Sequence, residues 1–367
     1  MKNVVVAYDG TLYTYKWVKT LMWAKKQFVS KGYNIQYVNF SSFFPIGNNA
    51  KKQIDALLCC KSIDIIMLAF HHSTATLYNR KDLDKIEILK CLRNKCDCIV
   101  WLDTADSTGT TQFEVLPYVD YYLKKQILKD LSLYEKHHYG QRIYLDYYHK
   151  KYNIEDSNID KTYTLLEPRF SNKIRVSWNI GLADIWRKGR YVILSPFAIR
   201  RPNILPSIGK REIDIFFNGF IKHTNLISLQ RKMICDIISK DNIRICPNPL
   251  AQMSHEQYIE FMKKTKIAVS PFGWGEICYR DFEAIVYGAV LLKPSVEHLV
   301  TYPDIFIANE TYIPIDWDFD KYEEIMSNID SKDYRNIAEK AQSVLIKHFS
   351  SEWGKEQFVN HVIRAIT

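Results

Sequence analysis

The hydrophobic pattern in the first part of the chain predicts β-strands that alternate with α-helices. Runs such as 4–8 and 98–102 are largely apolar, which is typical of strands buried on both faces of a parallel sheet. The helical spacing of Trp17, Leu21 and Phe28 predicts an amphipathic helix between two of these strands. The expected strands are 4–8, 33–40, 63–69, 98–102 and 119–123, and the expected helices are 16–31, 53–60 and 82–95.

The same alternation starts again after residues 196–210, a proline-containing stretch with no clear hydrophobic period. We therefore expect an α/β protein with two Rossmann-like domains, 1–195 and 211–367, joined by this linker. The expected strands of the second domain are 213–217, 243–246, 267–269, 289–292 and 305–308, and its expected helices are 225–239, 254–264, 277–287, 322–329, 334–349 and 353–366.

Residues 267–294 predict a strand, a glycine loop, a helix and a second strand. Gly273 and Gly275 let the backbone approach a ligand closely, and the first turn of the helix offers N–H groups and a partial positive charge to an anion. Arg280 adds a planar cation that suits phosphate oxygens. Glu283 follows on the same helix face, where it can accept hydrogen bonds from ribose hydroxyls. The segment is therefore a candidate site for a nucleoside diphosphate.

The longer motif Gly-x-Gly-x4-Arg-x2-Glu-Ala-x3-Gly-Ala-x3-Lys-Pro resembles the donor-binding segment of GT-B glycosyltransferases, particularly the exostosin-like group and related bacterial glycan-assembly enzymes. The resemblance is close over residues 211–317 and implies two Rossmann-like domains that face each other across a cleft. It places Glu283 and Gly288 on the helix that contacts the ribose of a nucleotide-sugar. Because Glu276 lies one residue closer to Glu283 than in the glutamate pair of many retaining members, we do not infer retention of configuration. The donor-binding residues that follow are Lys222, Gly273, Gly275, Glu276, Tyr279, Arg280 and Glu283.

Polar clusters follow three expected strands of the first domain, at the edge of the sheet where ligands bind in such folds. They are Asp9-Gly10-Thr11, residues 71–74 and residues 103–109. A carboxylate or histidine there could deprotonate an acceptor hydroxyl in an inverting reaction. Ordinary alternatives stay open, since an aspartate can cap a helix or form an Asx turn and a histidine can be a hydrogen-bonded core residue. The candidates, in declining order, are Asp103, Asp106, His71 and Asp9.

Residues 130–152 are rich in tyrosines and basic side chains, and we expect a helix-rich insertion there. Aromatic rings between cations suit a sugar phosphate, a lipid-linked acceptor or an anionic membrane surface. A tyrosine-rich packing surface with a solvated basic face explains the composition equally well.

Composition favours a globular, cytoplasmic protein. Hydrophobic residues make up 47% of the chain, yet no apolar run is long enough to span a bilayer and none near the start has the form of a signal peptide. The eight cysteines are then expected to be reduced thiols. The net charge of +9 favours phosphorylated ligands and also permits contact with the inner face of a membrane.

No metal site or other cofactor is expected. Cys91, Cys96 and Cys98 match no common zinc spacing, and residues 316–320 lack the glycine of a calcium loop. The Asp-x-Asp sequence at 82–84 lies in a helical run rather than after a strand. The helix terminus near Gly275, with Arg280 and Lys222, is expected to stabilise the leaving group instead.

The favoured function is metal-independent transfer of a sugar from a nucleotide-sugar donor to a glycan or lipid-linked acceptor, as in bacterial-type surface polysaccharide assembly. One rival is a basic, aromatic-rich nucleic-acid-binding protein, against which stands the lack of an RNA-recognition or helix-turn-helix signature. The other is a catalytically inactive GT-B scaffold.

Overall fold

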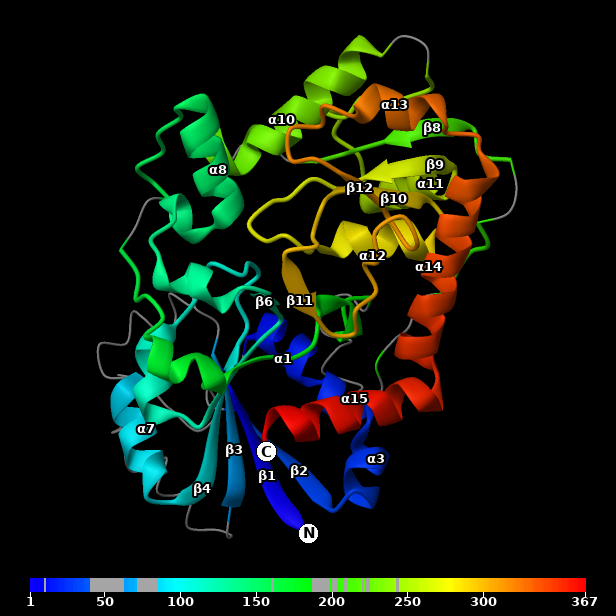
Figure 1. Ribbon diagram of the computed structural model, residues 1–367. Coiled ribbons are helices and arrows are strands. Elements are labelled where there is room, and N and C mark those ends of the chain that lie inside the picture. The colour runs from blue at the N-terminus through cyan, green and yellow to red at the C-terminus, as the bar shows by residue number, and fades with distance from the viewer. Residues whose placement is uncertain are drawn as a thin grey trace.

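The computed structural model describes residues 1–9, 11–39, 63–70, 85–159, 162–186, 199, 203–207, 210–219, 221, 225–241 and 244–367. Figure 1 shows two α/β regions, one at each end of the molecule, with the chain termini in the lower one. The predicted helix at 53–60 and the residues His71 and Lys222 lie outside the described ranges.

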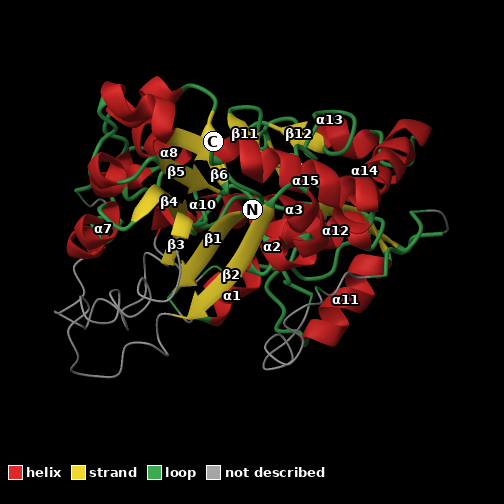
Figure 2. Cartoon of the chain, turned by 90° about the horizontal axis from the view of Figure 1, so that it is seen from below, coloured by secondary structure: helices red, strands yellow, loops and turns green. Residues whose placement is uncertain are grey.

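The first sheet has six parallel strands within the described ranges. Their apolar runs are covered on both faces, as expected for buried parallel strands, and the register places Val4 between Ile35 and Ile65. Helix α7 (Lys85–Arg93) packs against β4, and α3 (Lys25–Ser30) packs against β2. The order across the sheet is β2 (Tyr33–Asn39), β1 (Lys2–Tyr8), β3 (Ile63–Phe70), β4 (Cys96–Asp103), β5 (Tyr121–Lys124) and β7 (Ile174–Val176). Figure 2 shows β1 to β4 side by side.

The second sheet is also parallel and has four strands among the described residues. Their order is β12 (Ile313–Ile315), β10 (Val290–Pro294), β9 (Thr265–Val269) and β8 (Ile213–Phe216). The accompanying helices are α10 (Asn225–Lys240), α11 (His255–Lys263), α12 (Tyr279–Val286), α13 (Tyr322–Ser327) and α14 (Lys332–Ser350). The fold is therefore α/β with two Rossmann-like units, as the alternating pattern predicted.

The two units are joined by a shared strand pair. Strand β6 (Gln126–Leu128), between β5 and β7 in the chain, pairs antiparallel with β11 (Leu299–Thr301), between β10 and β12. Both strands lie between the two regions in Figure 1. One continuous apolar cluster also contains side chains from both sheets. Backbone hydrogen bonds and buried apolar area therefore hold the units against each other.

Helix α15 (Glu352–Ala365) packs against the first unit (Figure 1). Phe358 is buried, and its ring packs edge-on against Trp178 and Phe28. The Arg364 carbonyl oxygen accepts a hydrogen bond of 2.8 Å from Nη1 of Arg175, a residue of β7. Within the described residues, none of the helices combines the length and apolar character required to cross a bilayer.

Several predicted elements were wrong in detail. The single helix expected at 16–31 is three short helices, α1 (Leu12–Val18), α2 (Thr20–Trp23) and α3, and it begins earlier because the Thr11 side chain accepts a hydrogen bond from the Thr14 amide. Residues 305–308 form no strand, and β12 lies further along the chain. Residues 244–246 also form no strand, although the Ile245 carbonyl accepts a hydrogen bond from the amide of Asp214, a residue of β8.

The tyrosine-rich insertion is a packing element between the two units. Its helix α8 (Ile143–Tyr152) lies beside α10 in Figure 1. The hydroxyl of Tyr148 donates to the Trp317 carbonyl oxygen at 2.5 Å, and Tyr147 donates to Asp318. Lys151 forms an ion pair with the same Asp318 at 2.5 Å. These contacts give the aromatic and basic side chains of α8 a structural role.

His361 of α15 should make the stability of the protein depend on pH. Its ring stacks on Tyr302 with centroids 3.6 Å apart, and Nε2 lies 2.7 Å from the Ser177 carbonyl oxygen. Burial lowers the pKa of His361 to about 4. Between pH 6.5 and 4 this histidine is therefore protonated in the unfolded chain but neutral in the folded one. The unfolding free energy should fall as the pH falls, by up to ~3 kcal/mol from this group.

Urea denaturation at several pH values checks this expectation. His361→Gln should flatten the loss of unfolding free energy between pH 6.5 and 4, whereas the exposed control His137→Gln should leave it unchanged. An unchanged slope in His361→Gln would contradict the assignment.

Candidate functional site

The glycine loop connects β9 to α12. Helix α12 begins after Cys278, whose amide donates to the Asp281 carboxylate at 2.9 Å and so completes a capping box. Ser270, the first residue after β9, also donates to Asp281. The Nζ atom of Lys293, at the end of β10, lies 3.0 Å from Asp281, and both side chains are fully buried.

This capping changes the expected anion site. Asp281 places a carboxylate at the N-terminal end of α12, where the helix dipole would otherwise stabilise a bound anion. A diphosphate at this edge would therefore depend on side-chain cations more than on the helix terminus.

The glycines allow the loop to pack closely against protein. A Cβ atom at Gly275 would overlap the carbonyl oxygen of Asp106 in the first unit. A Cβ at Gly273 would meet only the guanidinium end of Arg231. Gly275 therefore permits direct backbone contact between the two units, and its predicted role in donor binding stays a prediction.

Side chains of the first unit also hold the loop. Tyr144 donates its hydroxyl to the Gly273 carbonyl at 2.7 Å, and Arg142 donates Nε to the Trp274 carbonyl at 2.9 Å. Trp274 itself keeps 44% of its surface exposed. The loop backbone is thus fixed by the insertion, while an aromatic ring at its tip faces solvent.

Glu276 also joins the units. Its buried carboxylate accepts hydrogen bonds from the amide and the hydroxyl of Thr108, at 3.1 and 2.5 Å. These bonds satisfy a charge that would be costly to bury alone. The structure therefore places Glu276 in the contact between the units rather than on an open surface.

Arg280 lies beside an open hollow of the second unit. Its Nη2 donates to the Asn218 carbonyl at 2.9 Å, and its guanidinium lies 5.0 Å from the ring centre of Phe217. Its buried Nε finds no hydrogen-bond acceptor within the part of the chain that the structure describes. Asn218 in turn donates to the Ala251 carbonyl at 3.0 Å and, with Gly219 and residues 249–254, lines a hollow of about 540 Å³.

Glu283 lies one helical turn beyond Arg280. Its Oε2 accepts a hydrogen bond of 2.9 Å from Tyr258 on α11, the helix that begins directly after residues 249–254 in the chain. Burial raises the pKa of Glu283, although the Tyr258 hydrogen bond and the Arg280 charge oppose this shift. Tyr279, just before Arg280, is 43% exposed. Arg280 and Glu283 thus share one face of α12, and Arg280 contacts Asn218, which lines the hollow.

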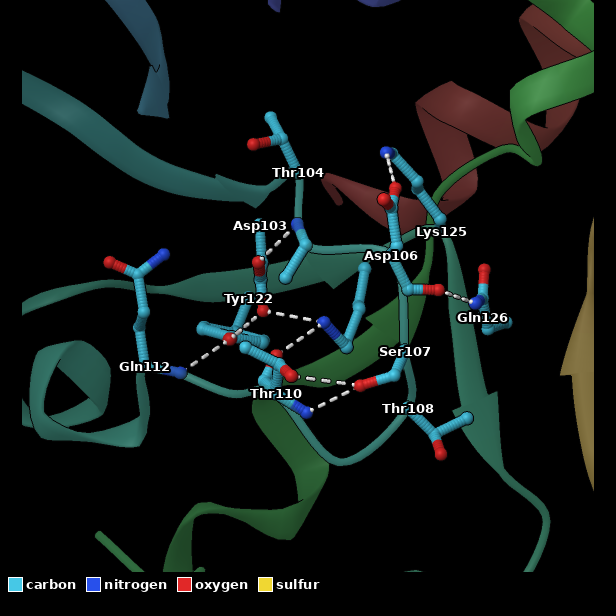
Figure 3. Close-up of polar contacts among 12 residues, drawn as sticks. Asp103, Thr104, Asp106, Ser107, Thr108, Thr110, Gln112, Tyr122, Lys125 and Gln126 are labelled. Atoms are coloured by element: carbon cyan, nitrogen blue, oxygen red, sulfur yellow. Dashed lines mark hydrogen bonds and ion pairs between the residues drawn. The ribbon is translucent and has the colours of Figure 1, made fainter. Parts of the chain in front are cut away.

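Asp103, the first candidate base, lies in the core. It is fully buried and accepts hydrogen bonds from Lys124 Nζ at 2.8 Å, from the Ala105 amide at 2.9 Å and from Tyr122 (Figure 3). Burial by itself would raise the pKa of Asp103, but the Lys124 charge and these hydrogen bonds hold it below its usual value. The structure therefore gives Asp103 the alternative role of an aspartate that fixes a turn.

Asp9 has a similar structural role. It is buried, and its Oδ1 accepts hydrogen bonds from the amide and the hydroxyl of Thr11, at 2.9 and 2.8 Å, at the start of α1.

Asp106 is different because its side chain is 51% exposed. Its Oδ1 accepts hydrogen bonds from Tyr13 and, at 3.1 Å, from Lys125 Nζ (Figure 3 shows the latter). Its backbone meets Gly275 of the second unit. Of the described candidates for a base, Asp106 is the one that an acceptor can reach at the junction of the two units.

Lys125, Tyr13 and Asp281 were not predicted as site residues, and Lys293 entered only as the lysine that ends the glycine-loop motif. A signal for Lys125 was present, since two successive lysines at the end of an apolar strand are unusual and a buried lysine needs a partner. The partners themselves are distant in sequence, so no local pattern identifies them.

No protein-family model matches this chain, and no curated protein matches it. Among solved structures, Anabaena Alr3699/HepE in complex with UDP is similar, with 8% identity, a TM-score of 0.45 and full coverage of both chains. An alpha-glucosyltransferase in complex with UDP-glucose and DNA containing an abasic site has 14% identity and a TM-score of 0.45, with 98% of each chain covered. The S. aureus MnaA-UDP co-structure has 11% identity and a TM-score of 0.41, covering 99% of this chain and 96% of that one. The function proposed below therefore rests on the residues of this chain.

The two glycines of the loop should respond differently to alanine. Gly275→Ala should lower the unfolding free energy by about 1–3 kcal/mol, because the backbone carbonyl of Asp106 cannot move aside easily. Gly273→Ala is the matched control and should cost less, because it meets the flexible end of Arg231. Urea denaturation measures both, and equal losses would contradict the proposed backbone contact.

Proposed function

We propose that this protein is a glycosyltransferase that moves a sugar from a nucleotide-sugar to a glycan or lipid-linked glycan, of the kind used in surface polysaccharide or glycoconjugate assembly. One observation carries the proposal. Arg280 and Glu283 lie on one face of α12, Arg280 contacts Asn218 in the lining of an open hollow, and the exposed carboxylate of Asp106 lies across the junction between the two units. Such a site has groups for a diphosphate, a ribose and an acceptor hydroxyl.

The donor is assigned to the second unit. The hollow formed by Asn218, Gly219 and residues 249–254 is open and of a size that suits a nucleoside base. Arg280 offers donor groups to phosphate oxygens, and Glu283 offers acceptors to ribose hydroxyls. Tyr258 holds the Glu283 carboxylate in place.

Catalysis is proposed to proceed without a metal ion. When the bond between the sugar and the diphosphate breaks, negative charge develops on the leaving phosphate. The Arg280 guanidinium is suited to stabilise it, because it is largely shielded from water and charge interactions are stronger there. Lys222, outside the described ranges, is a further candidate for this role.

Asp106 is proposed to act on the acceptor. In an inverting reaction it accepts the proton of the acceptor hydroxyl as that oxygen attacks the anomeric carbon. Its exposure and its contact with the loop of the second unit support this role.

Nucleotide binding tests the donor site. A thermal-shift panel of nucleoside diphosphates identifies the preferred base, because a ligand of the folded state raises the melting temperature. Calorimetry with that nucleotide should then show affinity losses of about 10- to 100-fold for Arg280→Ala, from lost charge-assisted hydrogen bonds, and about tenfold for Glu283→Ala. The exposed Arg335→Ala on α14 is the control and should bind normally. Unchanged affinity in both site variants would show that the donor binds elsewhere.

Turnover tests the base. Asp106→Asn should lower kcat at least about 100-fold, the usual contribution of a general base, with the protein still folded and activity in the wild type unaffected by EDTA. Asp103→Asn should instead lower the unfolding free energy by about 3 kcal/mol or more, because Lys124 would lose a buried partner. Turnover of Asp106→Asn within threefold of wild type would remove Asp106 from the mechanism.

A further inference from the structure

The buried ammonium group of Lys125 contacts the candidate base directly. Lys125 follows β5 and is 1% exposed. Its Nζ lies 3.1 Å from Oδ1 of Asp106 and also donates to the Tyr13 hydroxyl, which in turn donates to the same Oδ1. Lysine and tyrosine thus bind one oxygen of a carboxylate whose side chain is 51% exposed.

This arrangement differs from the other buried lysine pairs of the chain. Among the described residues, Lys19 pairs with Asp184, Lys124 with Asp103 and Lys293 with Asp281, and in each pair the acid is 0% exposed. Those pairs satisfy two charges inside the protein and leave nothing accessible. In contrast, the side chain of Asp106 is 51% exposed although that of Lys125 is only 2% exposed.

Burying the Lys125 ammonium group carries a cost that its partners must offset. Removing an ammonium group from water is unfavourable by several kcal/mol unless its partners compensate. Burial lowers the pKa of Lys125, and the charge of Asp106 opposes that shift. The rings of Tyr13 and Trp17 lie 4.4 and 5.7 Å from its Nζ and add cation–π attraction. The structure therefore pairs a buried ammonium group with an exposed carboxylate.

We propose that Lys125 and Tyr13 are positioning residues for Asp106, which keep its carboxylate ionised and aimed at the junction where the acceptor hydroxyl is deprotonated. The proposal rests on the proposed function and deepens it. In the transfer step the acceptor oxygen forms a bond to the anomeric carbon while its proton passes to Asp106. The bond from that carbon to the donor phosphate breaks, and its electron pair leaves with the nucleoside diphosphate.

The charges around Asp106 determine the pH at which it can act as a base. Lys125 favours its ionised form, whereas the nearby Asp103 is neutralised by Lys124. Replacing Lys125 by an apolar residue should therefore make the Asp106 carboxylate harder to ionise. Among the described residues, Tyr13, Lys125 and Tyr279 interact with Asp106, and Asp103 and Lys124 interact in turn with Lys125.

The test is the pH dependence of transfer in Lys125→Met and Tyr13→Phe. The midpoint of the acid limb of kcat should move upward by about one pH unit in Lys125→Met, as expected when an adjacent opposite charge is lost, and by less in Tyr13→Phe. At pH 7, above the acid limb, kcat should still fall about tenfold in Lys125→Met because the carboxylate is no longer held in position, while KM for the donor stays within about twofold, because the donor site is not touched. Tyr13→Phe retains the aromatic ring, so it remains available as the test variant if Lys125→Met fails to fold.

Lys19→Met is the matched control, since it removes another buried lysine from an ion pair of the same unit. It should lower the unfolding free energy and leave the acid limb in place. A shifted acid limb in Lys19→Met, or an unshifted one in both site variants, would overturn the positioning role.

A second measurement separates this inference from the proposed function. The carboxyl carbon of Asp106, assigned by Asp106→Asn, can be titrated by ¹³C NMR whether or not the protein transfers sugar. Its midpoint should rise by about one pH unit in Lys125→Met. If no nucleotide-sugar is consumed and the NMR midpoint still rises, the proposed function fails while the Lys125 contact stands. If transfer occurs and the midpoint is unchanged, the positioning role fails alone.

Discussion

The contact between the glycine loop of the second unit and the turn after β4 of the first determines the geometry of the whole site. Gly275 lies against the Asp106 carbonyl, and Glu276 binds Thr108 on the same turn. A backbone carbonyl leaves no space for a side chain at position 275, so the contact fixes how closely the units approach. It also fixes the separation of Asp106 from Arg280, because Arg280 lies in the first turn of α12, a few residues after Gly275.

The other contacts between the units reinforce this one. The pairing of β6 with β11, the packing of α15 on the first unit and the tyrosines of α8 all bury surface between them. A rigid junction suits a reaction in which two substrates must meet at a fixed distance, because positioning accounts for much of the barrier reduction in such reactions. Trp274 and Tyr279 remain exposed beside this junction.

The sequence predicts the parts of this structure that depend on local pattern. Apolar runs located the long strands, and the helix expected over 254–264 is α11, which starts at a capping box formed by Ser254. Strands β6, β7 and β11 are three residues long and have no detectable period, so only tertiary contacts define them. The site follows the same rule. Helix spacing predicted that Arg280 and Glu283 share one face of a helix. The burial of Asp103 depends instead on Lys124, a partner on the next strand that only tertiary packing brings alongside it.

A crystal structure with a bound nucleotide-sugar tests the central claim most directly. The account predicts the base in the hollow between Asn218 and residues 249–254, the diphosphate on Arg280, the ribose on Glu283 and the anomeric carbon facing Asp106. A nucleotide bound elsewhere, with this hollow empty or closed by protein side chains, would contradict it.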